Sequence, residues 1–376
     1  MSAQLPPGRT PSIRDVARLA GVSYQTVSRV LNHHPSVRDD TKARVLQVME
    51  ETQYRPNQAA RALATRHSRT IGVLSASNAQ YGPARSIAAI EDAAREAGYY
   101  VNTANLSAVD PESIAGAIGH LMEQAIEGLV VIAPQTRVFD VLAQMAIDVP
   151  YVSLQSTATS EHRALSVDQI AGARMATRHL IDLGHREIIH LAGPQDWIEA
   201  EARMRGFLDE IDEADLSTNP PVLGDWTAKF GYFAGHELLR TREFTAVFAA
   251  NDQMALGLLH AFRDAGRDIP RDISVVGFDD IPDAEHYCPP LTTVRQDHAE
   301  LGRRAVALLL GEVTVADAAR DARIMPALVV RASTGRARGR AQPLHKRDPN
   351  VLDTVMMSGK TIRVTGHIRR PQSTSA

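Results

Sequence analysis

At 376 residues, 44% of them hydrophobic and 23% charged, the chain is too long for one ordinary domain and has the composition of a soluble globular protein. It holds no apolar run long enough to cross a membrane and lacks the apolar segment of a signal peptide, so we expect a cytoplasmic protein without membrane contact. The single cysteine, Cys288, excludes an internal disulfide and a multi-cysteine zinc site, and we expect it to be a small buried hydrophobic residue.

Charge is unevenly distributed along the chain. Residues 1–70 hold 11 Lys/Arg against 5 Asp/Glu, a net charge of +6, and residues 336–376 hold 9 against 2, a net charge of +7. Residues 71–335 hold the remaining 21 Lys/Arg and 37 Asp/Glu, a net charge of −16. A basic head on an acidic body is what a protein needs if the head binds a polyphosphate that the body repels.

The first predicted helix begins after Ser12. Ser12 followed by Asp15 is an N-cap signal, and apolar residues then recur at helical spacing, namely Ile13, Val16, Ala17 and Ala20. Gly21 can take the left-handed conformation that ends a helix, and Ser23 can cap a second helix. Two helices joined by a turn of about four residues with a glycine form a helix-turn-helix motif.

The second predicted helix has two distinct faces. Its inward positions are Val27, Val30 and Leu31. Its outward positions are therefore Tyr24, Gln25, Ser28 and Arg29. Because arginine pairs with guanine, glutamine with an adenine edge and tyrosine with a thymine methyl or a phosphate, this face can read DNA bases; a merely solvated face would leave the charge distribution unexplained. A third helix, from about residue 40 to 52, closes the core with Val45, Val48 and Met49.

A short helix is predicted after the head. Pro56 breaks the preceding pattern, and Asn57 can cap residues 58–64, which are rich in alanine. A helix of two turns is marginal in water, so we expect it to form only against a partner chain or DNA. Leu63 then stands on a helix with little core of its own and can wedge between base steps.

Beyond residue 70, short apolar runs typical of β-strands alternate with helical patterns. The clearest runs are residues 71–74, 128–132, 151–154, 187–191, 246–249 and 273–276. About a dozen such strands suit two similar lobes, each a parallel sheet covered by helices on both faces. A ligand of such sheets lies beyond the carboxyl ends of the strands, where Gln155, Asn251 and Asp279 are the polar candidates.

Several of these segments together resemble the lac repressor (LacI/GalR) family of bacterial transcriptional regulators. In the head they are residues 15–17 (DVA), 20–29 (AGVSYQTVSR), 56–57 (PN) and 63–64 (LA). In the body they are residues 224–226 (GDW), 250–257 (ANDQMALG), 272–280 (DISVVGFDD) and 289–293 (PPLTT). The resemblance covers roughly residues 12–335, and its motifs are long and specific.

This resemblance implies a homodimer that binds double-stranded operator DNA. The first helix then braces the DNA backbone, and paired hinge helices put Leu63 of each chain into the central minor groove. The residues implied to contact DNA are Ser23, Tyr24, Gln25, Thr26, Ser28, Arg29, Asn32, Asn57, Leu63 and Ala64. The fold it implies is an all-α helix-turn-helix head followed by an α/β, two-lobed sensor like the periplasmic binding proteins, with two parallel doubly wound sheets.

A sugar or glycoside is the implied effector. Sugar sites need planar polar groups that bridge hydroxyls and an aromatic face for the ring, and the matched motifs provide both. The implied ligand residues are Arg203, Trp226, Asn251, Asp279 and Gln296. Ordinary core packing is the alternative role for Trp226, and an exposed ion pair with Glu199 or Glu201 is the alternative for Arg203.

The cavity departs from a galactoside-sensing member at three positions. Gln155 stands where an aspartate would be expected, His298 where a phenyl ring would be, and Ile132 where an asparagine would be. We include Gln155 and His298 among the candidate ligand residues. A cavity that exchanges a carboxylate for an amide and an asparagine for an aliphatic side chain should prefer a ligand with another hydroxyl pattern or with fewer polar groups. The expectation is therefore a sugar or glycoside without the restriction to β-galactosides.

The last residues differ from those of a tetrameric family member, which end in a leucine-heptad helix. Breakers interrupt this tail at Pro343, Pro349, Gly359, Gly366 and Pro371, so we expect a dimer with a disordered basic extension. The extension either adds non-specific DNA affinity or is merely solvated. The predicted parts are a DNA-binding domain (1–56), a hinge (57–69), a sensor (70–335, with an N-lobe of about 70–167 and 298–326 and a C-lobe of about 168–297 and 327–335) and a tail (336–376).

Other functions share parts of this pattern. A periplasmic sugar-binding protein has a two-lobed body but needs a signal peptide and no helix-turn-helix. The sequence contains no G-x-G-x-x-G, P-loop, G-x-S-x-G or H-E-x-x-H motif, so we expect no enzyme activity, no metal and no cofactor. We expect a nucleoid-associated repressor that its ligand releases from DNA; the alternative is a purine-type regulator whose ligand acts as a corepressor.

Overall fold

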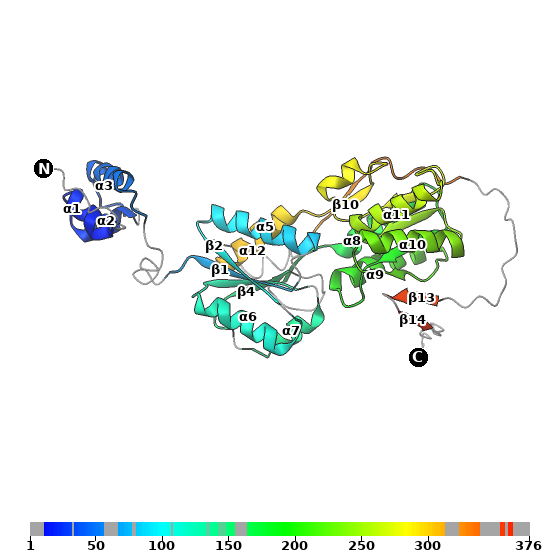
Figure 1. The fold of residues 1–376 in the computed structure, drawn as a ribbon, viewed down its shortest axis with the longest axis horizontal. Helices are drawn as coiled ribbons and strands as arrows, with labels where there is room; N and C mark the ends of the chain where they lie inside the picture. The colour runs from blue at the N-terminus through cyan, green and yellow to red at the C-terminus, as the bar shows by residue number, and fades with distance from the viewer. Residues whose placement is uncertain are drawn as a thin grey trace, which may run out of the picture. The chain divides into compact units, whose positions relative to one another are not determined.

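The computed structural model describes the chain as two units, residues 1–69 and residues 70–376. The described residues are 11–31, 34–55, 67–76, 80–106, 108–133, 135–142, 144–145, 147–154, 164–312, 323–338, 354–357 and 360–363. Each unit is a fold in its own right, and Figure 1 shows the elements of both. Among the described residues, no helix combines the length and apolarity that a membrane span requires.

The first unit is a small bundle of three helices, α1 (Ile13–Leu19), α2 (Tyr24–Leu31) and α3 (Asp39–Glu51). At the start of α1, the Ser12 backbone N–H donates to the Asp15 carboxylate at 3.0 Å, and the Asp15 N–H donates to Ser12 Oγ at 3.3 Å. Gly21 takes a φ of +63° between α1 and α2, as the helix-turn-helix prediction requires. The helices share a core of Val16, Ala17, Ala20, Val27, Val30 and Val45, so the predicted motif is confirmed.

The N-lobe of the second unit is built on a six-stranded parallel sheet in the order β11-β5-β4-β3-β1-β2. Its strands are β1 (Thr70–Ser75), β2 (Tyr100–Asn105), β3 (Gly128–Ile132), β4 (Tyr151–Leu154), β5 (Ala164–Val167) and β11 (Arg323–Ile324). Helices α5 (Tyr81–Glu96) and α12 (His298–Leu309) cover one face, and α6 (Pro111–Glu123) and α7 (Thr136–Leu142) cover the other. Strand β3 is buried along its whole length, which explains its continuous apolar sequence.

The C-lobe is built on a four-stranded parallel sheet in the order β7-β6-β8-β9. Its strands are β6 (Ile188–Ala192), β7 (Val222–Leu223), β8 (Ala246–Ala249) and β9 (Ser274–Val276). One face packs against α8 (Gln169–Asp182) and α9 (Ile198–Glu213), the other against α10 (Ala228–Thr241) and α11 (Asp252–Asp264). The predicted architecture of two parallel sheets, each covered on both faces, is confirmed.

The chain passes three times between the two lobes. The passages lie between β5 and α8, between β10 (Thr293–Arg295) and α12, and between β11 and β12 (Ala327–Val329). Strands β10 and β12 form an antiparallel pair beside α8. The 3-10 helix η1 (Pro282–His286) precedes β10. Side chains on these passages, including Gln169, Gln296 and His298, therefore lie where the lobes meet.

Two features differ from the sequence-based expectations. Cys288 is exposed rather than buried, because the loop after η1 turns the neighbouring Tyr287 into the core and leaves Cys288 at the surface. In the tail, β13 (Thr354–Met357) pairs antiparallel with β14 (Lys360–Arg363), where no regular structure was expected. The β-branched residues of both segments flank Ser358-Gly359 in the sequence, a composition that favours a hairpin.

Candidate functional site

A cavity of about 80 Å³ lies between the two lobes, at the carboxyl ends of their strands. Its N-lobe side is mostly apolar and includes Ile132, Leu154, Leu165, Val167 and Leu301. Its C-lobe side is mostly polar and includes Gln169, Glu199, Arg203, Asn251, Asp279 and Gln296. One wall can therefore cover apolar groups of a ligand while the other bonds to its hydroxyls.

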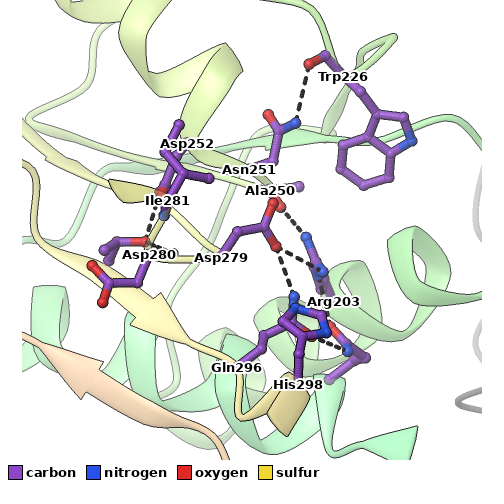
Figure 2. Close-up of polar contacts among 12 residues, drawn as sticks. Arg203, Trp226, Ala250, Asn251, Asp252, Asp279, Asp280, Ile281, Gln296 and His298 are labelled. Atoms are coloured by element: carbon purple, nitrogen blue, oxygen red, sulfur yellow. Dashed lines mark hydrogen bonds and ion pairs between the residues drawn. The ribbon is translucent and has the colours of Figure 1, made fainter. Parts of the chain in front are cut away.

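Arg203 is the central side chain of the polar wall (Figure 2). It projects from α9, is only 5% exposed, and stacks over the Phe278 ring, with Cζ 3.8 Å from the ring centroid. Its Nε donates to Gln169 at 2.8 Å, its Nη1 donates to the Ala250 carbonyl, and its Nη2 lies 3.3 Å from Asp279 Oδ1. The alternative of an exposed ion pair with a helix glutamate is therefore wrong.

Four side chains of the polar wall form a closed ring of contacts. Gln169, which receives the Arg203 bond, donates through Nε2 to Gln296 Oε1 at 2.7 Å. Gln296 donates through Nε2 to Asp279 Oδ1 at 2.8 Å, and Asp279 closes the ring by its ion pair with Arg203. All four are buried. Each member fixes the next, so a ligand meets a polar surface that is already ordered.

Asp279 carries the charge that balances Arg203. It follows β9, is 7% exposed, and has a φ of +110°, a conformation that non-glycine residues seldom adopt. Burial raises the pKa of Asp279 to about 6, while Arg203 and the Gln296 hydrogen bond act in the opposite direction. The carboxyl is therefore poised to change charge near neutral pH.

Trp226 supplies the aromatic surface of the C-lobe wall. It is 6% exposed, has a φ of +70°, and is held by Asn251, whose Nδ2 donates to the Trp226 carbonyl at 3.0 Å. Asn251 Oδ1 also accepts the Met254 N–H at 2.9 Å and so caps α11. Gly193 is required beneath the indole, because a Cβ there would lie 2.2 Å from Trp226 Cη2.

His298 lies in the cavity wall, at the end of the passage between β10 and α12 that connects the two lobes. It is the first residue of α12, and its Nδ1 lies 3.2 Å from Ser86 Oγ on α5. Its ring meets Tyr81 edge to face, with centroids 6.3 Å apart. Burial, with nearby Arg85 and Arg203, lowers the pKa of His298 to about 4, so the imidazole is neutral at physiological pH.

Asp252 supports the site without lining the cavity. Its Oδ2 accepts the Ile281 N–H at 2.9 Å, and its Oδ1 accepts the Thr293 hydroxyl at 2.6 Å (Figure 2). Burial and the nearby Asp279 raise the pKa of Asp252 well above its ordinary value. The residue thereby ties the loop after Asp279 to strand β10, which fixes where Asp279 points.

The structure brings most of the predicted ligand residues to this one cavity. These are Arg203, Trp226, Asn251, Asp279, Gln296 and His298, whereas Gln155 lies outside the described residues. Sequence reasoning missed Tyr81, Ser86, Gln169, Trp197 and Glu199 as lining residues. Gln169 could have been found, because it follows β5 by two residues and polar residues at the carboxyl ends of strands are site candidates. The others lie on helices or loops that reach the cavity only in the folded sensor.

The predicted reading face of the first unit is open to solvent. Tyr24 is 50% exposed, and Gln25 and Arg29 are exposed with it, while Thr26 and Ser28 are half-buried. Ser23 caps the N-terminus of α2, since its Oγ accepts the Thr26 N–H at 3.1 Å. The other predicted DNA contacts, Asn32, Asn57, Leu63 and Ala64, lie outside the described residues.

Two family models match the chain. The model of bacterial regulatory proteins of the lacI family matches residues 12–57. The model of the periplasmic binding protein-like domain matches residues 177–334. The first match coincides with the helical head, and the second spans most of the C-lobe together with α12, β11 and β12.

Curated relatives match over most of their length. The lactose operon repressor of Escherichia coli (strain K12) is 34% identical over 325 residues, which are 86% of this chain and 90% of that protein. The transcriptional regulator CelR of Thermobifida fusca is 35% identical, covering 81% and 93% respectively. The transcriptional repressor PurR of Haemophilus influenzae (strain PittEE) is 34% identical, covering 81% and 92%. These relatives are regulators of transcription.

Solved structures give the same result for the fold. The lac repressor dimer bound to operator and the anti-inducer ONPF aligns with a TM-score of 0.77 at 33% identity, covering 87% of this chain and 100% of that chain. The complex of the regulator CelR with cellobiose aligns with a TM-score of 0.60 at 30% identity, covering 86% and 99%. The similarity thus extends over the head and both lobes.

Proposed function

The chain belongs to the lacI family of bacterial regulatory proteins, and on that basis we propose that it is a transcriptional repressor, without enzymatic activity, that a sugar or glycoside releases from DNA. It binds a palindromic operator as a dimer in the cytoplasm. Residues 1–56 form the DNA-binding domain, 57–69 the hinge, 70–335 the sensor and 336–376 a basic tail.

The closed ring of Arg203, Gln169, Gln296 and Asp279 is the observation that carries the sugar assignment. Both contacts of Asp279 within the ring reach Oδ1, so Oδ2 is the oxygen that a ligand hydroxyl would meet. An ionised carboxylate accepts such a bond strongly, and the Trp226 indole, which lines the same cavity, suits the apolar face of a sugar ring. A cavity that suits a sugar supports the proposal that the ligand is an inducer rather than a purine corepressor.

Ligand binding is coupled to DNA release because both lobes line the cavity. A sugar that favours the closed arrangement shifts the population of the lobes, and the shift separates the hinge segments of the dimer. A thousandfold fall in operator affinity would need roughly 4 kcal/mol of differential ligand binding per dimer. One two-state equilibrium of the lobes thus connects the cavity to DNA binding.

An exposed apolar surface supports the dimer. On α10 and α11, Phe233 is 61% exposed and Leu256 is 40% exposed, and both line a surface groove together with Cys288. Large apolar side chains of this kind mark protein contacts. We expect Phe233→Asp to shift the protein toward monomers in sedimentation and to weaken operator binding, whereas Leu208→Asp on α9 should leave both unchanged. A dimer that persists in Phe233→Asp would move the interface elsewhere.

Operator release tests the proposed function directly. Fluorescence anisotropy with operator-like palindromes selected from a random pool should show binding by the full chain, and added glucose, galactose, cellobiose or lactose should release it. The PurR relatives support a second candidate, a purine-responsive regulator whose ligand strengthens DNA binding. Tighter operator binding with hypoxanthine or guanine, and no release by sugars, would replace the inducer mechanism by the corepressor one.

A further inference from the structure

Glu199 brings a carboxylate to the cavity in addition to the Arg203–Asp279 pair. It precedes Arg203 by four residues on α9, so the two side chains share one helix face, and both line the cavity. Among the described residues, its buried Oε2 has no hydrogen-bond partner. A buried carboxylate oxygen is costly to leave unsatisfied, so the position favours a bound group that donates a hydrogen bond.

The nearby groups do not satisfy Glu199. Arg203 is the cation that acts on the Glu199 carboxyl, yet its contacts are with Gln169, Ala250 and Asp279, and no hydrogen bond from it reaches Glu199 Oε2. Asp279 is compensated by Arg203 and Gln296. Burial accordingly raises the pKa of Glu199. Glu199 Oε2 is therefore an acceptor of a cavity-lining residue that the described residues leave without a donor.

Two further unsatisfied atoms belong to residues that line the same cavity. The described residues offer no partner to Trp226 Nε1, which can only donate, or to His298 Nε2. A hydroxyl both donates and accepts, so a polyhydroxylated ligand can serve all three atoms. The aromatic residues that line the cavity meet edge to face, Trp197 with Trp226 at 66° and Tyr81 with His298 at 80°.

We propose that Glu199 is a specificity-determining residue of this site, and that it accepts a hydrogen bond from a hydroxyl of a neutral saccharide whose other hydroxyls reach Asp279 and the Trp226 indole N–H. This inference rests on the proposed function, because it assigns a ligand class to the same cavity. Glu199, one helical turn before Arg203 on α9, recognises one hydroxyl of the saccharide. A sugar that lacks this hydroxyl therefore binds more weakly.

Titration calorimetry of the full-length dimer tests the assignment. Glucose, galactose, cellobiose and lactose are titrated into the wild type, and the tightest of these four is then titrated into Glu199→Gln. The control is Glu201→Gln, which changes an exposed glutamate of the same helix turn that lies outside the cavity. We expect Glu199→Gln to lose about tenfold or more in affinity, with operator binding and thermal unfolding unchanged, and Glu201→Gln to bind as the wild type does.

Two results would overturn the assignment, and they are distinguishable. Sugar binding by Glu199→Gln at wild-type affinity would remove Glu199 from the site while leaving the sugar-released repressor intact. A wild type that binds guanine or hypoxanthine but none of the four sugars would overturn the saccharide class and the proposed inducer together. A deoxy sugar that loses affinity in the wild type but not in Glu199→Gln would identify the hydroxyl that Glu199 accepts.

Discussion

The predicted reading face of α2 and the cavity of the second unit use polar side chains in opposite ways. On α2, Tyr24, Gln25 and Arg29 extend into solvent. In the cavity, Arg203 and Asp279 belong to a closed ring of buried contacts. Exposed long side chains keep rotamer freedom that is lost only on binding, whereas the ring loses it on folding. The head can thus adapt to bases, and the cavity selects by a fixed geometry.

Breaking the ring should give the largest effect. Arg203→Ala leaves Asp279 buried without its cation and removes three contacts, so we expect about 3–5 kcal/mol less stability of the second unit and loss of sugar binding. Chemical denaturation measures the stability. Arg205→Ala is the matched control, because Arg205 lies on the exposed side of the same helix and should contribute less than about 1 kcal/mol. Equal effects of the two changes would mean that the ring is not a stabilising unit.

The reading face should respond without any loss of stability. Arg29→Ala is expected to cost about 1–3 kcal/mol at one base pair in each operator half-site, since an exposed arginine that reads guanine makes no contribution to the core. Binding to a set of single-base operator variants measures this cost. A loss spread evenly over all sequences would show that Arg29 contacts phosphate rather than a base.

Acid should weaken sugar binding through Asp279. Its pKa of about 6 means that the carboxylate is ionised at pH 7.5 and takes up a proton as the pH falls through 6. Because hydroxyl donors need the ionised form, sugar affinity should fall by about tenfold per pH unit below 6 and be level above 7. His298, with a pKa of about 4, stays neutral over most of this range. Calorimetry between pH 5 and 8 should show a much flatter profile for Asp279→Asn.

The smallest effect concerns the start of α1. Ser12→Ala removes the two hydrogen bonds that the Ser12 hydroxyl makes with Asp15, keeps the one from the Ser12 backbone N–H, and should destabilise the helical head by about 1 kcal/mol. Hydrogen exchange in the intact chain should become faster over residues 13–51, while the second unit serves as the internal reference. Faster exchange in both units would mean that the head is not an independent folding unit.

Local patterns predicted most of the fold. The capping box at Ser12 depends on residues three apart, and strands β1, β3, β4, β6, β8 and β9 are apolar runs that their own sequences display. The edge strand β2 (YVNTAN) mixes polar and apolar residues and was not predicted. Asn251 and Asp279 could be placed because they lie two and three residues beyond the ends of β8 and β9. The exposure of Cys288 could not, since it depends on which side of a loop Tyr287 takes, and composition gives only the usual preference of cysteine.

The site residues that sequence analysis did not find depend on contacts between residues far apart in the chain. Gln169 matters because Gln296, distant in sequence, completes its hydrogen bonds. Glu199 has the sequence spacing of a surface ion pair with Arg203. It becomes a ligand candidate only because Arg203 forms its ion pair with Asp279 and leaves Glu199 Oε2 without a partner among the described residues. Pairing of this kind is decided by packing between distant segments of the C-lobe, which periodicity along one helix does not report.

Operator release by sugar in Asp279→Asn is the most direct test of the account. The change keeps the shape of the side chain and removes the charge that accepts a ligand hydroxyl, worth roughly 1.5–3 kcal/mol. In anisotropy titrations we expect Asp279→Asn to bind the operator as tightly as the wild type and to need at least about tenfold more sugar for release. Loss of operator binding before any sugar is added would contradict the account, because Asp279 would then support the DNA-bound state rather than the release from it.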